Sequence, residues 1–261
     1  GFRGGFNATL SIKTSSTDLH SGLYGGVVPN AIHEMNSILN KIVNSKNNEI
    51  LIPNFYDDVD AITPELLENN KNIPFSEEHF KKIAGVKELV IKSDYDVYSL
   101  LGLMPTIQVT GIYSGYVGEG YRNSVPAQAI AKINFRLVES QKPEKIIRIV
   151  TEYLSKIIPS HVDHTFEVSE PYEGIKIDFN NKYAKKTIKI VSNVYGKKPT
   201  LKFCGGSIPI VTYFKQMLGL ENVLVPLGNE DCAMHAVDEN FRINYIEKGL
   251  EFSYEFLKLE T

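Results

Sequence analysis

The sequence predicts a mixed fold, in which a split βαβ, or ferredoxin-like, α+β unit with an insertion is followed by roughly half of an α/β domain. Four segments alternate apolar and polar residues with a period of two, which is typical of strands with one buried face. Two segments between them carry apolar residues at helical spacing. Further along, the short segment 223–225 is entirely apolar and lies between helical patterns, which is typical of a buried parallel sheet.

The first strand and the first helix are predicted near the start of the sequence. The apolar residues of the strand, which alternate with polar ones, are Phe6, Ala8, Leu10 and Ile12. After the glycine-rich stretch 21–26, Pro29 suits the opening of a helix that we expect to end near Asn44. Its apolar residues recur at helical spacing: Ile32, Met35, Ile38, Leu39 and Ile42.

Residues 45–104 interrupt this pattern. They lack clear periodicity and are rich in Asn, Lys and Glu, so we expect an insertion with short helices. Strands are predicted again at 107–109 and 129–137, then a helix between Pro143 and Pro159 and a fourth strand at 162–168. The order βα, insertion, ββαβ is that of an antiparallel sheet with two helices on one face. We therefore expect residues 6–170 to form one domain.

The pattern changes at about residue 171. Helices are expected at 181–194, 208–218 and 242–258, and strands at 201–203 and 223–225. So few strands amount to about half of a doubly wound domain. We expect residues 171–261, together with 1–5, to be part of an α/β catalytic domain. We also expect the chain to be a fragment, with the missing part before Gly1.

Composition limits the kinds of partner. The chain has 28 Lys and Arg against 31 Asp and Glu, a net charge of −3, which gives no reason to expect nucleic acid or an anionic membrane as a partner. No run of apolar residues is long enough to span a bilayer. Cys204 and Cys232 form no CxxC motif, so we expect two reduced thiols in a cytoplasmic protein. A small molecule is the expected ligand.

Two loops near the predicted strands combine polar groups with glycines. In the loop 16–26, His20 could donate a hydrogen bond to a developing oxyanion, although a lone loop histidine is more often structural. The second loop, 118–126, precedes the strand that carries Arg136. Arg136 lies on the face opposite Phe135, where its guanidinium could bind a carboxylate bidentately or simply be solvated.

Two further loops lie in the second half of the chain. The turn at 204–209 offers its free backbone N–H groups and the hydroxyl of Ser207 to an anionic group, although Ser207 could equally be an ordinary helix N-cap. The loop 228–240 follows the apolar strand and contains His235, a candidate metal ligand with acidic neighbours. These acids are Glu230, Asp231, Asp238 and Glu239.

Taken together and in this order, the motifs resemble the M20 family of dinuclear zinc peptidases, most closely its carnosine dipeptidase-like branch. The segments that carry the resemblance are DLHSGLYGG at 18–26, PTIQVTGIYSGYVGEGYRNSVPAQAIAKINFRLV at 105–138, GGSIP at 205–209 and HAVDENFRINYIEKG at 235–249. They extend over nearly the whole chain. Four ordered motifs are far more specific than any single one.

The resemblance implies a ferredoxin-like lid that is inserted into a zinc-binding catalytic domain and that forms the homodimer. It implies that His20 acts in trans, stabilising the tetrahedral intermediate in the active site of the partner subunit. Asn123 and Arg136 would hold the carboxylate or backbone of a small peptide substrate. Ser207, with Gly206 beside it, would also bind substrate, and His235 would be a terminal zinc ligand.

The sequence also departs from the family. No HxD pair followed by the series of acidic ligands that holds the two zinc ions in the family occurs in it, and the pair Glu77-Glu78 lies in the insertion, outside that context. We therefore expect the chain alone to bind zinc weakly and to be inactive. Carnosinase-like members read REGGSIP where this sequence has Phe203-Cys204 before the glycines, which weakens a claim for carnosine-type substrates.

Three functions remain open. The leading one is part of a zinc metallopeptidase, dipeptidase or carboxypeptidase, that hydrolyses short peptides. The second is a non-catalytic homodimerisation or binding module. The third is an M20 amidohydrolase that acts on N-acyl amino acids.

Overall fold

The computed structural model describes residues 1–91, 94–229, 231–234 and 237–258. It contains two compact units, each described on its own below. The first comprises Gly1–Thr63, Val90–Ile175 and Phe203–Thr212, and the second comprises Pro64–Leu89, Lys176–Lys202 and Tyr213–Thr261.

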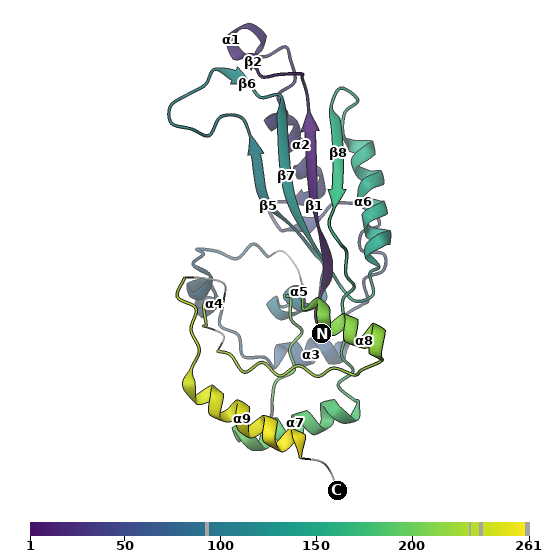
Figure 1. Ribbon diagram of the computed structural model, residues 1–261, viewed down its shortest axis with the longest axis vertical. Coiled ribbons are helices and arrows are strands. Elements are labelled where there is room, and N and C mark those ends of the chain that lie inside the picture. Colours follow the sequence, from purple (N-terminus) through teal and green to yellow (C-terminus); the bar gives the residue numbers. More distant parts are fainter. Residues whose placement is uncertain (92–93, 230, 235–236, 259–261) are drawn as a thin grey trace. The chain divides into compact units, whose positions relative to one another are not determined.

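The first unit is built on a sheet of four strands. These are β1 (Gly4–Lys13), β5 (Thr106–Ser114), β7 (Gln128–Leu137) and β8 (Asp163–Val168). Their order is β5-β7-β1-β8, and all neighbours are antiparallel (Figure 1). Consequently β5 is parallel to β1 across β7, and β8 is parallel to β7 across β1. These are two interleaved βαβ units, so the predicted ferredoxin-like arrangement is confirmed.

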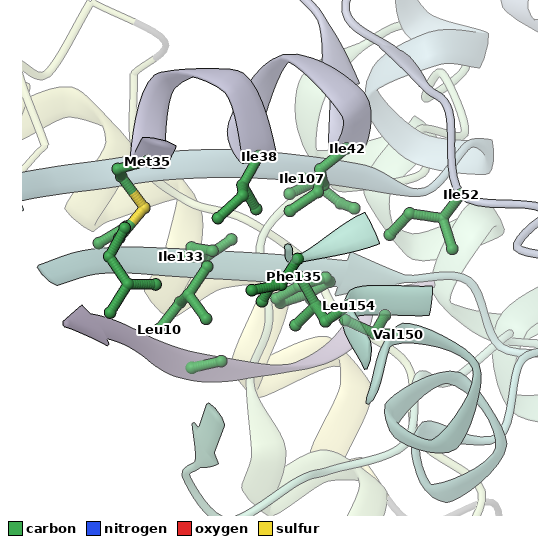
Figure 2. Packing of buried hydrophobic residues seen from close by; sticks show 14 of the residues in the cluster. Leu10, Met35, Ile38, Ile42, Ile52, Ile107, Ile133, Phe135, Val150 and Leu154 are labelled. Carbon is green, nitrogen blue, oxygen red and sulfur yellow. The ribbon is translucent and has the colours of Figure 1, made fainter. Parts of the chain in front are cut away.

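Two helices, α2 (Ala31–Ile42) and α6 (Pro143–Ile157), supply the apolar residues that cover one face of the sheet. The side chain of Asn30 caps α2 by accepting from the N–H of Ile32 at 2.8 Å, and Pro143 occupies the first turn of α6. The alternation in β1 places Phe6 and its apolar neighbours under these helices. Figure 2 shows the buried side chains that meet there: Leu10, Met35, Ile38, Ile42, Ile107, Ile133, Phe135, Val150 and Leu154.

The predicted insertion contributes both to the core and to short helices. The hairpin of β3 (Val43–Asn44) and β4 (Glu49–Ile50) is followed by buried Ile52 and Phe55, which join the main core. Gln141, which has no exposed surface, donates from Nε2 to the carbonyl of Phe55 at 2.7 Å. The segment ends with α5 (Val97–Leu103), whose N-cap is Asp96.

The second unit is helical. It contains α3 (Pro64–Lys71), α4 (Glu77–Ala84), α7 (Lys182–Tyr195) and α9 (Ile243–Leu257), with α7 packed against α9. The helix α8 (Pro209–Leu218) also forms close to its predicted position. Among the described residues no helix has the length and apolarity needed to cross a membrane.

The strands predicted at 201–203 and 223–225 are not formed, and that prediction was wrong for the structure described. A strand exists only through ladder hydrogen bonds to a neighbour. Within the described residues neither segment has such a neighbour, and the isolated parallel bridge between Phe2 and Cys204 lies just beyond the first of them. Apolar composition alone is therefore not enough to create the parallel sheet.

Candidate functional site

His20 lies in a small two-stranded sheet beyond one end of the main sheet. This sheet pairs β2 (Leu19–His20) with β6 (Ser124–Val125), so that His20 is opposite Ser124 (Figure 1). It also brings the predicted residues His20 and Asn123 together, because the N–H of Ser21 donates to the carbonyl of Asn123 at 3.0 Å. Both side chains are exposed.

The imidazole of His20 has a defined orientation. It precedes the short helix α1 (Ser21–Tyr24), and its Nδ1 accepts from the N–H of Gly22 at 3.1 Å. A neutral imidazole that accepts at Nδ1 carries its proton on Nε2. Within the described chain Nε2 has no partner, so it presents an N–H to solvent. A Cβ at Gly22 would lie only 3.0 Å from Cε1 of His20, so a side chain at this position would displace the imidazole.

Asp18 ties the His20 loop to the sheet, and sequence reasoning gave it no role. Its Oδ1 accepts from the N–H of Ala127, just before β7, at 3.0 Å. Its Oδ2 lies 3.8 Å from Nη1 of Arg122, a long and partly exposed pair that adds little stability.

Arg136 and Ser207 meet at the other end of β7. Nη1 of Arg136 donates to Oγ of Ser207 at 2.6 Å and to the hydroxyl of Tyr172 at 3.2 Å. The Tyr172 hydroxyl in turn donates to Ser207 at 2.9 Å, and Nε of Arg136 donates to Oδ1 of Asn134 at 3.0 Å. We call Asn134, Arg136, Tyr172 and Ser207 the Arg136 cluster.

Ser207 belongs to a turn, Gly205–Ser207, which we call the glycine turn. Its hydroxyl bonds to the Arg136 cluster rather than to the start of α8, so the N-cap alternative is not what the structure shows. The N–H of Gly206 points at Sγ of Cys204 at 3.4 Å, a weak bond. No acceptor for the N–H of Ser207 occurs within the described residues, so this donor remains available to a ligand.

The electrostatics of this end of the sheet favour an anion. Arg3 is buried beside Arg136, and among the residues described no Asp or Glu pairs with either guanidinium. Burial and, secondarily, the charge of Arg136 lower the pKa of Arg3 to about 10, so it keeps its proton at neutral pH. Nη2 of Arg136 also lacks an acceptor within the described part of the chain. Two unneutralised cations next to free N–H donors suit a carboxylate.

Sequence reasoning missed Arg3, Asn134 and Tyr172. Tyr172 reaches the cluster because the segment after β8 runs against the start of β1. A Cβ on Gly4 would lie 2.4 Å from the nitrogen of Gly174, so only glycine allows the approach. In the sequence, Gly4 could have indicated that another part of the backbone comes close at this point. A glycine alone does not identify which segment that is.

His20 and Arg136 lie at opposite ends of the four-stranded sheet. Gln128 begins β7 on the His20 side and Arg136 lies eight residues further along, a separation of about 26 Å at the usual strand rise. Figure 1 shows β2 and β6 beyond one end of the sheet, whereas β1 starts from the opposite end. In one chain, His20 and Arg136 cannot contact the same small ligand.

The loop at 229–242 is closed by hydrogen bonds. Nδ2 of Asn229 donates to Asp231 at 2.8 Å and to Asn240 at 3.0 Å, and Nη2 of Arg242 donates to Asp231 at 2.7 Å. The bond from Asn229 and the charge of Arg242 lower the pKa of Asp231. The predicted metal ligand His235 and its neighbour Glu230 lie outside the described residues.

The described residues do not supply a metal centre. They contain no group of three or more His, Cys, Asp or Glu side chains that could hold a metal ion. Glu77 and Glu78 lie in the first turn of α4, where Glu77 pairs with Lys81 at 3.1 Å, the arrangement of an ordinary helix start. A metal centre would therefore need ligands other than these residues.

Comparison with known proteins gives consistent similarities. The family described as the M20 peptidase dimerisation domain matches residues 5–162. The chain is 27% identical to the Cys-Gly metallodipeptidase dug1 of Schizosaccharomyces pombe, over 96% of the chain and 53% of that protein. It is 26% identical to the human Beta-Ala-His dipeptidase, over 99% of the chain and 52% of that protein. The chain thus spans about half the length of these curated relatives.

Solved structures show the same similarity. The M20 family metallo-carboxypeptidase Sso-CP2 from Sulfolobus solfataricus superposes with a TM-score of 0.88 at 29% identity, covering 99% of this chain and 59% of that one. The dipeptidase Dug1p from Saccharomyces cerevisiae gives a TM-score of 0.84 at 26% identity, covering 98% and 54%.

Proposed function

This chain belongs to the M20 peptidase family, and we propose that it is the lid, residues 6–170, and part of the catalytic domain of a metallopeptidase that hydrolyses dipeptides or short peptides. The observation that carries the proposal is the Arg136 cluster. It combines an unneutralised guanidinium, a hydroxyl and a free backbone N–H at one place. These are the groups that recognise the terminal carboxylate of a peptide.

In this proposal Arg136 binds the substrate carboxylate through Nη2, and Ser207 adds its hydroxyl and its N–H. Asn134 and Tyr172 hold the guanidinium in place through Nε and Nη1. Gly206 carries no side chain, and the space beside its Cα is open, because an added Cβ would meet only Cys204 Sγ at 3.5 Å. A fixed carboxylate places the scissile bond at a constant distance from the catalytic groups.

His20 and Asn123 act in trans. A fully extended dipeptide is only about 7 Å long, far short of the roughly 26 Å between Gln128, at the His20 end of β7, and Arg136 in one chain. A second copy of the lid would bring its own His20 to the Arg136 of the first. The exposed Nε2–H of His20 then donates to the oxyanion of the tetrahedral intermediate, and Asn123 assists in holding the substrate.

A homodimer formed through the lid supplies that second copy. Support comes from β5, an edge strand whose outer backbone groups have no strand neighbour in the described sheet. Apolar side chains are also exposed near the His20 end: Leu23, Val27, Val117 and Tyr121. We further propose a cytoplasmic location, because Cys204 and Cys232 are both free thiols.

The metal of this proposal is zinc, two ions per active site, with His235 as one ligand. Zinc would activate a water molecule and polarise the scissile carbonyl. The remaining ligands would come from sequence outside this chain.

The test uses a protein that contains this chain at its natural full length. We expect hydrolysis of free dipeptides, such as Cys-Gly or β-Ala-His, that is abolished by a chelator and restored by zinc. Faster hydrolysis of N-acetyl amino acids than of dipeptides would favour the amidohydrolase alternative. No hydrolysis of either class, with a dimer still formed, would overturn the proposal in favour of a binding module.

A further inference from the structure

Arg3 is a buried cation whose partners are all neutral oxygens. Only 9% of the Arg3 residue is exposed to solvent. Nε donates to the carbonyl of Gly205 at 2.8 Å, and Nη1 donates to the carbonyl of Met104 at 3.1 Å and to Oγ1 of Thr106 at 3.2 Å. The backbone N–H of Arg3 donates to the carbonyl of Gly206 at 3.1 Å. Arg3 therefore makes two of its four bonds to the glycine turn.

These bonds connect the glycine turn to the strands on either side of Arg136. In the sheet, Arg136 of β7 is paired with Gly5 of β1 on one side and with Thr106 of β5 on the other. Arg3 lies two residues before Gly5 and bonds directly to Thr106. The side chain of Arg3 thus sets where Ser207 stands relative to Arg136.

The glycine turn packs closely against Arg3 on one side and α5 on the other. A Cβ on Gly205 would lie 2.8 Å from Nη2 of Arg3 and 2.4 Å from the carbonyl oxygen of Leu101. The turn is therefore held between the guanidinium and the end of α5. Because Nε of Arg3 donates to the carbonyl of Gly205, the position of the guanidinium constrains that of the turn.

A guanidinium is a costly choice for a purely structural brace. Burying it without a carboxylate, next to the like charge of Arg136, disfavours its charged form. Neutral donors could make bonds to the same carbonyls without this cost. The charge is useful, however, if an anion binds beside it, because the anion then compensates both guanidinium groups.

We propose that Arg3 is a positioning residue for substrate carboxylate binding: it holds the glycine turn so that Ser207 meets Arg136, and its charge strengthens the attraction for the anion. This inference rests on the proposed function, and it adds a residue that the motifs did not single out.

The test compares Arg3→Met and Arg3→Lys with the wild type in the full-length protein. For Arg3→Met we expect KM for a free dipeptide to rise about tenfold, as for the loss of one charge-assisted contact, with kcat changed less than about twofold. KM for the C-terminally amidated dipeptide should not change. Arg3→Lys keeps the charge but not the fork of donors, so its KM should lie between the two. Arg148→Met, which removes an exposed arginine of α6, is the control and should match the wild type.

A double-mutant cycle with Ser207→Ala tests whether Arg3 acts through the turn. If it does, the effects of Arg3→Met and Ser207→Ala on KM are not additive. Additive effects, or an equal loss of activity on the free and the amidated dipeptide, would overturn the inference and leave Arg3 a structural residue.

Binding measurements separate this inference from the proposed function. Calorimetry with N-acetylglycine and with its amide needs no hydrolysis. A wild-type preference for the acid that is lost in Arg3→Met supports the inference even in a protein that hydrolyses nothing. No such preference in the wild type, or an unchanged one in a folded Arg3→Met or Arg3→Lys variant, overturns it.

Discussion

Nη1 of Arg136 donates to Oγ of Ser207 at 2.6 Å across 71 residues of sequence, and this bond joins the four-stranded sheet to the glycine turn. The two residues come from segments with different predicted folds. Their contact is the centre of the proposed carboxylate site.

Removal of the Arg136 charge should selectively weaken binding of free peptides. For Arg136→Met we expect KM for a free dipeptide to rise about 10- to 100-fold, because a charge-assisted pair contributes about 1.5–3 kcal/mol. The amidated dipeptide should be affected little. The control is Lys132→Met, on the same strand and the same face, whose Nζ bonds only to Thr9. An equal loss for both substrates would contradict carboxylate recognition by Arg136.

Subunit complementation should reveal whether His20 acts in trans. At a free dipeptide concentration well below KM, we expect His20→Ala and Arg136→Met to lose about 90% or more of wild-type turnover when each is expressed alone. Mixed dimers of the two variants contain one site with both residues intact, so random pairing should recover about a quarter of wild-type turnover. The measurement is turnover of co-expressed, co-purified variants. Absence of recovery, with mixed dimers present, would place His20 and Arg136 in separate roles.

The ionised carboxylate of Asp231 should stabilise the folded protein near neutral pH but not in acid. The folded-state pKa of Asp231 is lowered, first by the bond from Asn229, so its contribution is present above the unfolded value of about 3.9 and is lost as the pH falls through the folded value. We therefore expect Asp231→Asn to lower Tm near neutral pH, and the difference from the wild type to shrink in acid. Thermal unfolding of both proteins across this range is the measurement. A pH-independent difference would mean that the charge of Asp231 does not contribute.

Gln141 should be required for stability although it is polar. It is fully buried, and it satisfies the carbonyl of Phe55 and the N–H of Val138 at the end of β7. Gln141→Met fills the space but leaves both backbone groups unpaired, so we expect a loss of about 2–4 kcal/mol in the free energy of unfolding. Gln108→Met, on the exposed side of β5, is the matched control. Denaturant unfolding measures both, and similar values for the two variants would argue against the buried bonds.

The sheet and its two helices could be predicted from sequence because their periodicity records which face is buried. The alternation around Phe6 and Phe135, whose rings stack at 4.4 Å, is a local pattern that requires no knowledge of distant residues. The segment 223–225 shows the limit of this reasoning. Its apolar residues satisfy the pattern of a buried strand, but its state depends on a partner strand that the pattern cannot specify.

The candidate site was accessible from sequence only in part. Arg136 and Ser207 stand in motifs that gather glycine and polar residues, so both could be identified, but their contact could not. Tyr172 and Arg3 lie in no such motif. Tyr172 reaches the site through the close approach at Gly4, and Arg3 through its burial against the glycine turn, and both depend on tertiary packing.

The length of β7 has a consequence for regulation. The strand is part of a continuous hydrogen-bonded sheet, so bending cannot reduce the distance of about 26 Å between its His20 end and Arg136 by the amount that one dipeptide would require. Under the proposed mechanism, each turnover needs two chains. Specific activity should therefore decline when the protein is diluted below the dissociation constant of the dimer. In that range, doubling the expression level of the protein would more than double its total activity.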